Sequence, residues 1–190
     1  MVTPELLRST FAQGLAYGDY VATGTPAQVE NWRRAEAGFQ LGPSRESLVR
    51  GFDRRLHVLV ISGMWCGDCA QQCPMLAAIA LANPRNVLLR FVDRDKHLEL
   101  ATHVMICGGL RVPTVLFLNE DFEFVSLLGD RTLARYRAAA ARQLGPTCAL
   151  PGAALPTDEA EATLQDWVNE FERVALLLRM SPKLRERHAD

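Results

Sequence analysis

Two thiols, Cys66 and Cys69, are separated by two residues in the stretch Trp-Cys-Gly-Asp-Cys at 65–69. On a helix, residues three apart have Cα atoms about 5 Å apart, within disulfide range, whereas residues seven apart are separated by roughly 10 Å. Cys66 and Cys69 can therefore bridge, whereas Cys66 cannot reach Cys73 without unwinding the helix. Side-chain directions along one helix face disfavour a bridge between Cys69 and Cys73. The competent couple is Cys66–Cys69.

A close thiol pair at a strand-to-helix junction indicates either a redox couple or half of a metal site. Cys66, Cys69, Cys73 and Cys107 supply the four ligands that a structural zinc ion needs. Three of them lie on one helix without forming a second Cys-x-x-Cys, and the fourth lies in another segment. The spacing therefore favours redox chemistry over metal binding.

The position of each thiol indicates its chemical role. A thiol reacts as its thiolate, and the free N–H groups of a helix N-terminus stabilise negative charge. Cys66 lies at that N-terminus and is the candidate nucleophile, and Cys69, one turn deeper, is the candidate resolving thiol. Gly67 permits close approach of a substrate backbone, and Trp65 supplies an apolar wall beside the sulfur.

The composition limits the classes of protein to which the chain belongs. Its 190 residues, 48% hydrophobic and 23% charged, suit a globular protein with a substantial core. The formal charge of −1 offers no basic footprint for nucleic acid. No basic segment leads into an apolar one at the N-terminus, and no apolar run approaches membrane-spanning length. We therefore expect a cytoplasmic protein that contacts neither nucleic acid nor membrane.

The order of elements predicts an α/β fold. Helix start signals at Thr3-Pro4 and Thr25-Pro26, with a third short helix at about 44–52, make residues 1–52 a helical extension packed on the core. Strands and helices then alternate through residues 53–145, which implies a mixed sheet with helices on both faces. Residues 146–190 form a loop and an amphipathic C-terminal helix. The predicted strands are 56–62, 87–93, 113–118 and 122–127, and the predicted helices between and after them are 66–82, 95–106 and 131–143.

Several residues together resemble the thioredoxin family over about residues 50–144. They are the motif at 65–69, Pro74, Val112-Pro113-Thr114 at the start of a strand, and Gly129 after a hairpin. The resemblance implies a thioredoxin-like three-layer fold, here with an N-terminal helical extension and an extra C-terminal helix. It also implies that Pro113 is a cis-proline facing the site and that the Val112 backbone pairs with an extended substrate segment. Pro74 should kink the active-site helix.

Three positions depart from the family pattern. Thioredoxins have proline where this chain has Asp68. Their buried acid and its partner lysine align with Val60 and Leu89, which are apolar here. We predict that Asp68 tunes the site by keeping the pKa of Cys66 higher than proline would, because a neighbouring carboxylate opposes thiolate formation. Such tuning favours a reductant.

The sequence therefore predicts a thiol–disulfide oxidoreductase that reduces protein disulfides through a Cys66–Cys69 cycle, without a bound cofactor. Electrons would come from an unidentified reductase or a low-molecular-weight thiol. The alternative is a redox-sensing or partner-binding module of the same fold without significant turnover. A glutaredoxin-like role with glutathione or an iron–sulfur cluster fits the motif poorly. The terminal helices are a candidate surface for a homodimer.

The other cysteines receive separate predictions. Cys73 is expected in the core. Cys107, beside Gly108-Gly109 and shortly before Pro113, is a candidate for the active face. Cys148, in a predicted loop, is expected to be an exposed incidental thiol.

Overall fold

The chain folds around a four-stranded mixed sheet. The computed structural model describes residues 2–144, 155 and 157–189, and within them the strand order is β2-β1-β3-β4. The strands are β1 (Leu56–Ser62), β2 (Val87–Asp93), β3 (Thr114–Leu118) and β4 (Phe124–Gly129). β1 runs parallel to β2 and antiparallel to β3, and β4 forms an antiparallel hairpin with β3. The predicted mixed sheet is confirmed, and β1 and β2 have the predicted bounds.

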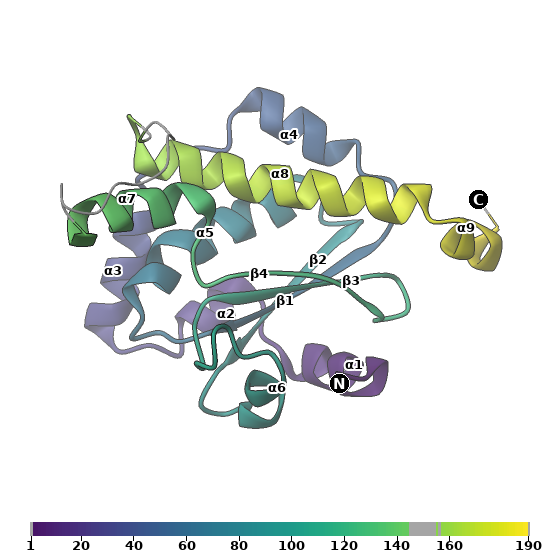
Figure 1. The fold of residues 1–190 in the computed structure, drawn as a ribbon, viewed down its shortest axis with the longest axis horizontal. Helices are drawn as coiled ribbons and strands as arrows, with labels where there is room; N and C mark the ends of the chain where they lie inside the picture. Colours follow the sequence, from purple (N-terminus) through teal and green to yellow (C-terminus); the bar gives the residue numbers. More distant parts are fainter. Residues whose placement is uncertain (1, 145–154, 156, 190) are drawn as a thin grey trace.

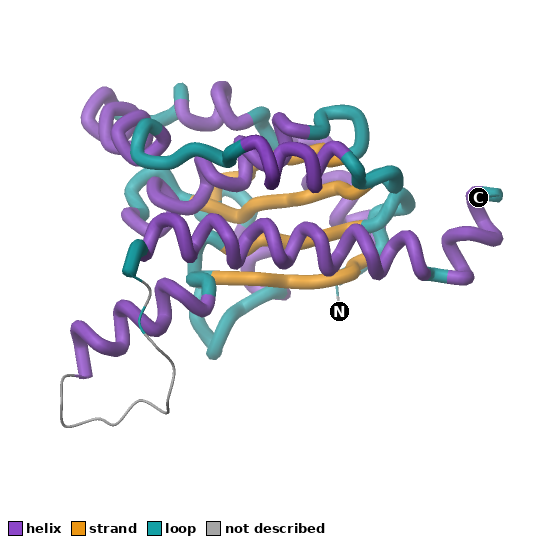
Figure 2. Tube along the Cα trace, turned by 90° about the horizontal axis from the view of Figure 1, so that it is seen from above, coloured by secondary structure: helices purple, strands orange, loops and turns teal. Residues whose placement is uncertain are grey.

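Helices cover both faces of the sheet and make a three-layer α/β fold (Figure 1). On one side lie α5 (Gly67–Ala82) and α8 (Glu159–Met180), and on the other lie α1 (Pro4–Gln13) and α6 (Leu98–His103). Figure 2 shows α8 running along the direction of the strands. The other helices in the described part of the chain are α2 (Tyr17–Val21), α3 (Pro26–Glu36), α4 (Pro43–Arg50), α7 (Leu133–Leu144) and α9 (Pro182–His188).

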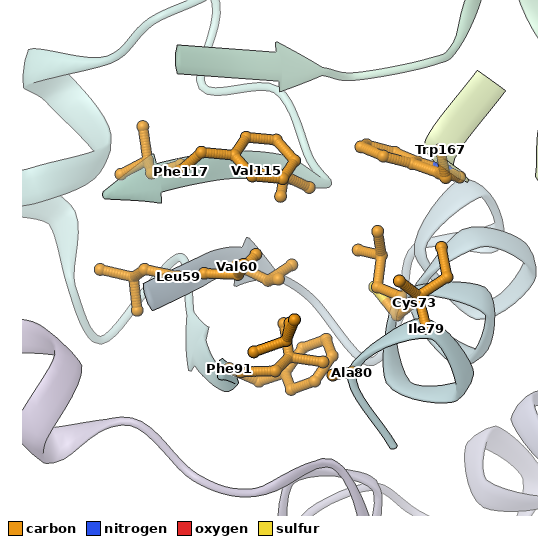
Figure 3. Packing of buried hydrophobic residues seen from close by; sticks show 14 of the residues in the cluster. Leu59, Val60, Cys73, Ile79, Ala80, Phe91, Val115, Phe117 and Trp167 are labelled. Atoms are coloured by element: carbon orange, nitrogen blue, oxygen red, sulfur yellow. The ribbon is translucent and has the colours of Figure 1, made fainter. Parts of the chain in front are cut away.

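The core forms around β1, which is buried along its whole length. A neighbouring strand on each side and a helical layer on each face explain why this segment reads as continuously apolar. Figure 3 shows Val60 of β1 between Phe91 of β2 and Val115 of β3. Trp167 of α8 packs on the same side of the sheet as α5. Trp32 of α3 is also fully buried, so both tryptophans are core residues.

The N-terminal helices begin where the sequence indicates. The Thr3 side chain accepts the Leu6 N–H at the start of α1, and Thr25 forms a capping box with Gln28 at the start of α3. Between them, Leu15 exchanges two backbone hydrogen bonds of 2.9 Å with Phe91. That pairing covers the outer edge of β2. The division of the chain into an extension at residues 1–52 and a domain at residues 53–145 stays a prediction. Most of the predicted loop at 145–156 lies outside the described residues.

Some helices differ from their predicted extent. α6 spans six residues rather than 95–106. The Asp93 carboxylate accepts the N–H groups of Asp95 and Lys96 at 2.9 and 3.2 Å, so a side-chain turn occupies the residues before the helix. α2 and α9 were not predicted. Each is short, and each buries side chains against other elements, Tyr20 and Val21 on α2 and Leu184 on α9.

α8 carries the apolar stripe that the sequence predicts for the C-terminal helix. Its fully or nearly fully buried residues recur at helical spacing: Thr163, Leu164, Trp167, Val168, Phe171, Val174 and Leu178. α8 packs against α7, α5 and α4, and Phe171 of the buried stripe contacts Phe117 of β3. Neither α8 nor any other helix in the described part of the chain is both long and apolar enough to cross a membrane.

The burial of Trp167 predicts a large stability loss on truncation. Trp167→Ala should lower the free energy of unfolding by about 3–5 kcal/mol, because the removed ring leaves a cavity between α8 and α5. Leu176→Ala, on the exposed face of the same helix, should change it by no more than about 0.5 kcal/mol. Urea unfolding followed by circular dichroism measures both, and equal losses in the two variants would contradict the packing described for α8.

Candidate functional site

The two motif thiols lie at the N-terminus of α5 in different environments. Cys66 is the N-cap residue, and its sulfur accepts the backbone N–H of Cys69 at 3.2 Å. Cys66 is half-buried, whereas Cys69 is completely buried, and both are free thiols. One thiol is therefore accessible at the helix end, and the other is shielded one turn below it, as the spacing predicts.

The segment before β3 meets the motif. The Val112–Pro113 peptide bond is cis, as the resemblance implies. The Cys66 thiol donates to the Val112 carbonyl oxygen at 3.5 Å, so residues 46 positions apart lie in contact. Gly129, at the end of β4, lies against this segment. A Cβ there would sit 2.4 Å from the Pro113 carbonyl oxygen, so only glycine permits this approach.

Trp65 and Gly67 flank the accessible thiol. The Trp65 side chain is 53% exposed and lies over Gly63, where a Cβ would come within 2.7 Å of the ring. The Arg94 guanidinium stacks over the same ring, 4.6 Å from its centroid, and donates to the Leu110 carbonyl at 3.2 Å. Arg94 therefore joins the motif to the segment before Pro113. No atom lies within 4 Å of a Cβ built at Gly67, so the space beside it is open.

Asp68 is held by two arginines of the α7 region. Arg131 donates to its carboxylate at 2.9 Å and Arg135 at 2.5 Å. Burial raises the pKa of Asp68, but the hydrogen bonds and charges of the two arginines outweigh it and hold that pKa below the usual value of 3.8. Asp68 is thus ionised and largely neutralised by its partners, which weakens the field that it exerts on the thiols.

Neither thiol ionises easily in the reduced pair. The hydrogen bond with the Cys69 thiol, followed by partial burial, raises the pKa of Cys66, and the Cys69 backbone N–H opposes that shift. The Asp68 charge raises it further, in the predicted direction but as one of the smaller contributions. Burial raises the pKa of Cys69 well above its usual value. Both thiols are therefore protonated at neutral pH in the reduced pair.

The sequence did not single out several residues that shape this site. Arg94 follows β2, Arg131 lies two residues before α7, and Arg135 lies in the first turn of α7. Their only sequence signal is the spacing of two arginines four residues apart directly after Gly129-Asp130, which does not reveal a partner at position 68. Gln72 was also missed. Its side-chain amide donates to the Asp130 carbonyl at 2.9 Å and ties α5 to the start of α7.

The remaining cysteines lie in three different settings. Cys73 is fully buried in the core, as predicted. Cys107 is exposed at a left-handed backbone position with φ +50°. Cys148 lies outside the described residues. Within the described ranges, no group of three or more histidine, cysteine, aspartate or glutamate residues is placed to hold a metal ion.

Comparisons with known proteins agree with this fold. A family model described as thioredoxin matches residues 14–139, about two-thirds of the chain, and so extends into the N-terminal helices. A crystal structure of a Pseudomonas aeruginosa protein of unknown function matches with a TM-score of 0.67 at 20% identity, over 92% of this chain and 97% of that one. An HIV epitope-scaffold matches with a TM-score of 0.57 at 19% identity, over 92% and 93%. At these identities both structures show the fold alone, and no curated protein matches.

The Asp68 ion pairs predict a loss of stability in acid. Because the folded pKa of Asp68 lies below its unfolded value, the pairs stabilise the protein fully above that value and lose their contribution as the pH falls through the folded pKa. Asp68→Asn should lower the free energy of unfolding by about 1–3 kcal/mol at neutral pH. The difference from wild type should shrink below about pH 4. Urea titrations across this range measure it, and a difference that stays constant with pH would contradict the assignment.

Proposed function

Because this chain belongs to the thioredoxin family, we propose that it is a thiol–disulfide oxidoreductase that reduces protein disulfides. The contact that supports this proposal most directly is the one between the Cys66 thiol and the Val112 carbonyl, beside the cis-peptide bond at Pro113. It sets the half-buried Cys66 thiol next to the segment that precedes β3, where a bound disulfide would need to lie.

The exchange proceeds in two steps. Cys66 loses its proton, and its thiolate attacks one sulfur of the substrate disulfide, forming a mixed disulfide and releasing the first substrate thiolate. Cys69 then loses its proton and attacks the Cys66 sulfur, which closes the Cys66–Cys69 disulfide and releases the second substrate thiolate. The two substrate thiolates take up two protons. The cysteine pair gives up two electrons, and the substrate disulfide receives them.

The surrounding residues have separate roles in this proposal. The Val112 backbone beside Pro113 pairs with an extended segment of the substrate, in the manner of an added strand. The open space at Gly67 admits the substrate backbone, and the exposed ring of Trp65 packs against its apolar groups. The exchange needs no bound cofactor. A reductase or a low-molecular-weight thiol restores the dithiol after each turnover.

A partner-binding or redox-sensing module is the second candidate. The buried apolar side chains of Val60 and Leu89 favour it, because they leave no carboxylate or ammonium group beneath Cys69 at those positions to assist turnover. Such a module would form the Cys66–Cys69 disulfide slowly and would not turn over. An assay that detects multiple turnovers therefore distinguishes the oxidoreductase from the binding or redox-sensing module.

Turnover should depend on both motif thiols. In a dithiol-driven assay with a protein disulfide as substrate, Cys66→Ser should abolish turnover, because no other accessible thiol lies at the N-terminus of α5. Cys69→Ser should accumulate a covalent complex with the substrate through Cys66, visible by mass spectrometry. Cys107→Ser, an exposed cysteine outside the motif, should retain wild-type turnover. Equal turnover in Cys66→Ser and wild type would contradict the proposed oxidoreductase activity.

The charges around Asp68 should set the pH at which Cys66 becomes reactive. A carboxylate about 6 Å from a thiolate raises its pKa by roughly 0.5 to 2 for an effective dielectric between 80 and 20. Asp68→Asn should therefore move the midpoint of Cys66 alkylation by iodoacetamide to lower pH. Arg131→Gln, which removes a neighbouring positive charge, should move it to higher pH. Mass spectrometry of the Cys66 peptide follows both rates, and an unchanged or higher midpoint in Asp68→Asn would exclude the proposed tuning.

A further inference from the structure

A buried hydroxyl lies beneath the motif thiols. Ser62, the last residue of β1, is completely buried, and its Oγ lies 3.6 Å from the Cys73 sulfur. Cys69 lies one turn before Cys73 on α5. Burial raises the pKa of its thiol, and the Ser62 hydroxyl opposes that shift. The Ser62 backbone is held in place, because its carbonyl oxygen accepts the backbone N–H of Arg94 at 2.8 Å. Ser62 thus lies beside the buried thiols of α5.

Cys69 requires a stabilising partner at this position. Its sulfur must carry a negative charge when it attacks the mixed disulfide, yet the side chain is shielded from water. A buried charge without hydrogen bonds is costly. The buried strand positions 60 and 89 carry a valine and a leucine, which cannot donate a hydrogen bond. Figure 3 shows Cys73 of α5 facing the sheet in which Val60 lies.

We propose that the Ser62 hydroxyl donates a hydrogen bond to the Cys69 thiolate during the resolving step, while the Cys73 thiol donates to Ser62 Oγ. The inference rests on the proposed function and adds a residue that touches a reacting atom. The proton that Cys69 loses goes to the second substrate thiolate, so Ser62 stays neutral and only orients its own hydrogen. No further acid or oxidant is required.

Other titratable groups face this cluster from three elements. Cys66 and Cys73 lie on α5, Tyr20 projects from α2, and Asp93 ends β2 opposite Ser62. Burial raises the pKa of Tyr20, and the nearby Cys73 and Cys69 raise it further, so its phenol stays neutral. Asp93 uses its carboxylate to accept backbone N–H groups of the following turn. The neutral donors of this cluster are therefore Ser62, Cys73 and Tyr20, and of these Ser62 is the one whose effect on the Cys69 thiol lowers its pKa.

The two steps can be timed separately with a chromogenic aromatic disulfide whose thiolate product absorbs visible light. In stopped flow, the first release of product reports attack by Cys66, and the second reports resolution by Cys69. Every protein in this experiment carries Cys107→Ser and Cys148→Ser, so that neither of these two thiols reacts with the aromatic disulfide. Ser62→Ala should leave the first phase unchanged and slow the second by about tenfold to a hundredfold at neutral pH, the range expected for a lost hydrogen bond to a charged group.

The pH profile distinguishes this role from a packing defect. The slowing in Ser62→Ala should diminish as the pH rises, because Cys69 then ionises without the donor. Ser62→Thr, which keeps the hydroxyl, should restore the second phase. Thr163→Val, which removes another completely buried hydroxyl, on α8, should leave both phases at wild-type rates.

The possible results separate this inference from the proposed function. Two phases in wild type with an unchanged second phase in Ser62→Ala would overturn the role of Ser62 alone. Slowing that is equal at every pH, or equal in both phases, would overturn it as well. A wild-type protein in which Cys66 does not attack the aromatic disulfide would overturn the proposed function, and this inference with it.

Discussion

The antiparallel pairing of β1 with β3 is the constraint on which the site depends. It sets Ile61 opposite Thr114, so the loop that follows β1 and the segment that precedes β3 meet at the same edge of the sheet. Cys66 comes from the first and Val112 from the second. Their contact is therefore a consequence of strand register. A slip of one residue would turn each side chain of β1 to the opposite face, and Ser62 would no longer lie beneath α5.

Helical periodicity then assigns each cysteine of α5 a different environment. Cys66 caps the helix at the protein surface, whereas Cys69 and Cys73 follow on successive turns that face the core. The negative charge of a Cys66 thiolate lies at the exposed N-terminus of α5, where backbone N–H groups and solvent stabilise it. In the interior, a neutral donor, the Ser62 hydroxyl, lies close to the Cys73 sulfur. A protein interior tolerates a transient thiolate when such donors are fixed in advance.

The ionic groups near the motif lie outside this buried cluster. Asp68 pairs with Arg131 and Arg135, and Arg94 stacks on Trp65. These contacts fix the position of the motif relative to α7 and to the segment before Pro113. The negative charge of Asp68 is opposed by the positive charges of Arg131 and Arg135, so the local field at Cys66 is the sum of opposing contributions. This balance explains why replacing one charged group is expected to move the reactivity of the thiol in a defined direction.

Local sequence patterns were sufficient to predict many of the strands, helix starts and thiol positions of this protein. Continuous apolar runs predict β1 and β2 because a strand between two helical layers excludes polar residues, and Thr3 and Thr25 mark helix starts through their own hydrogen bonds. The spacing of Cys66 and Cys69 predicts a competent pair because helix geometry alone sets their separation. α2 and α9 could not be predicted, since they are stabilised by burial against distant elements. The partners of Asp68 and the place of Ser62 likewise arise from contacts between segments far apart in the chain, which no local spacing encodes.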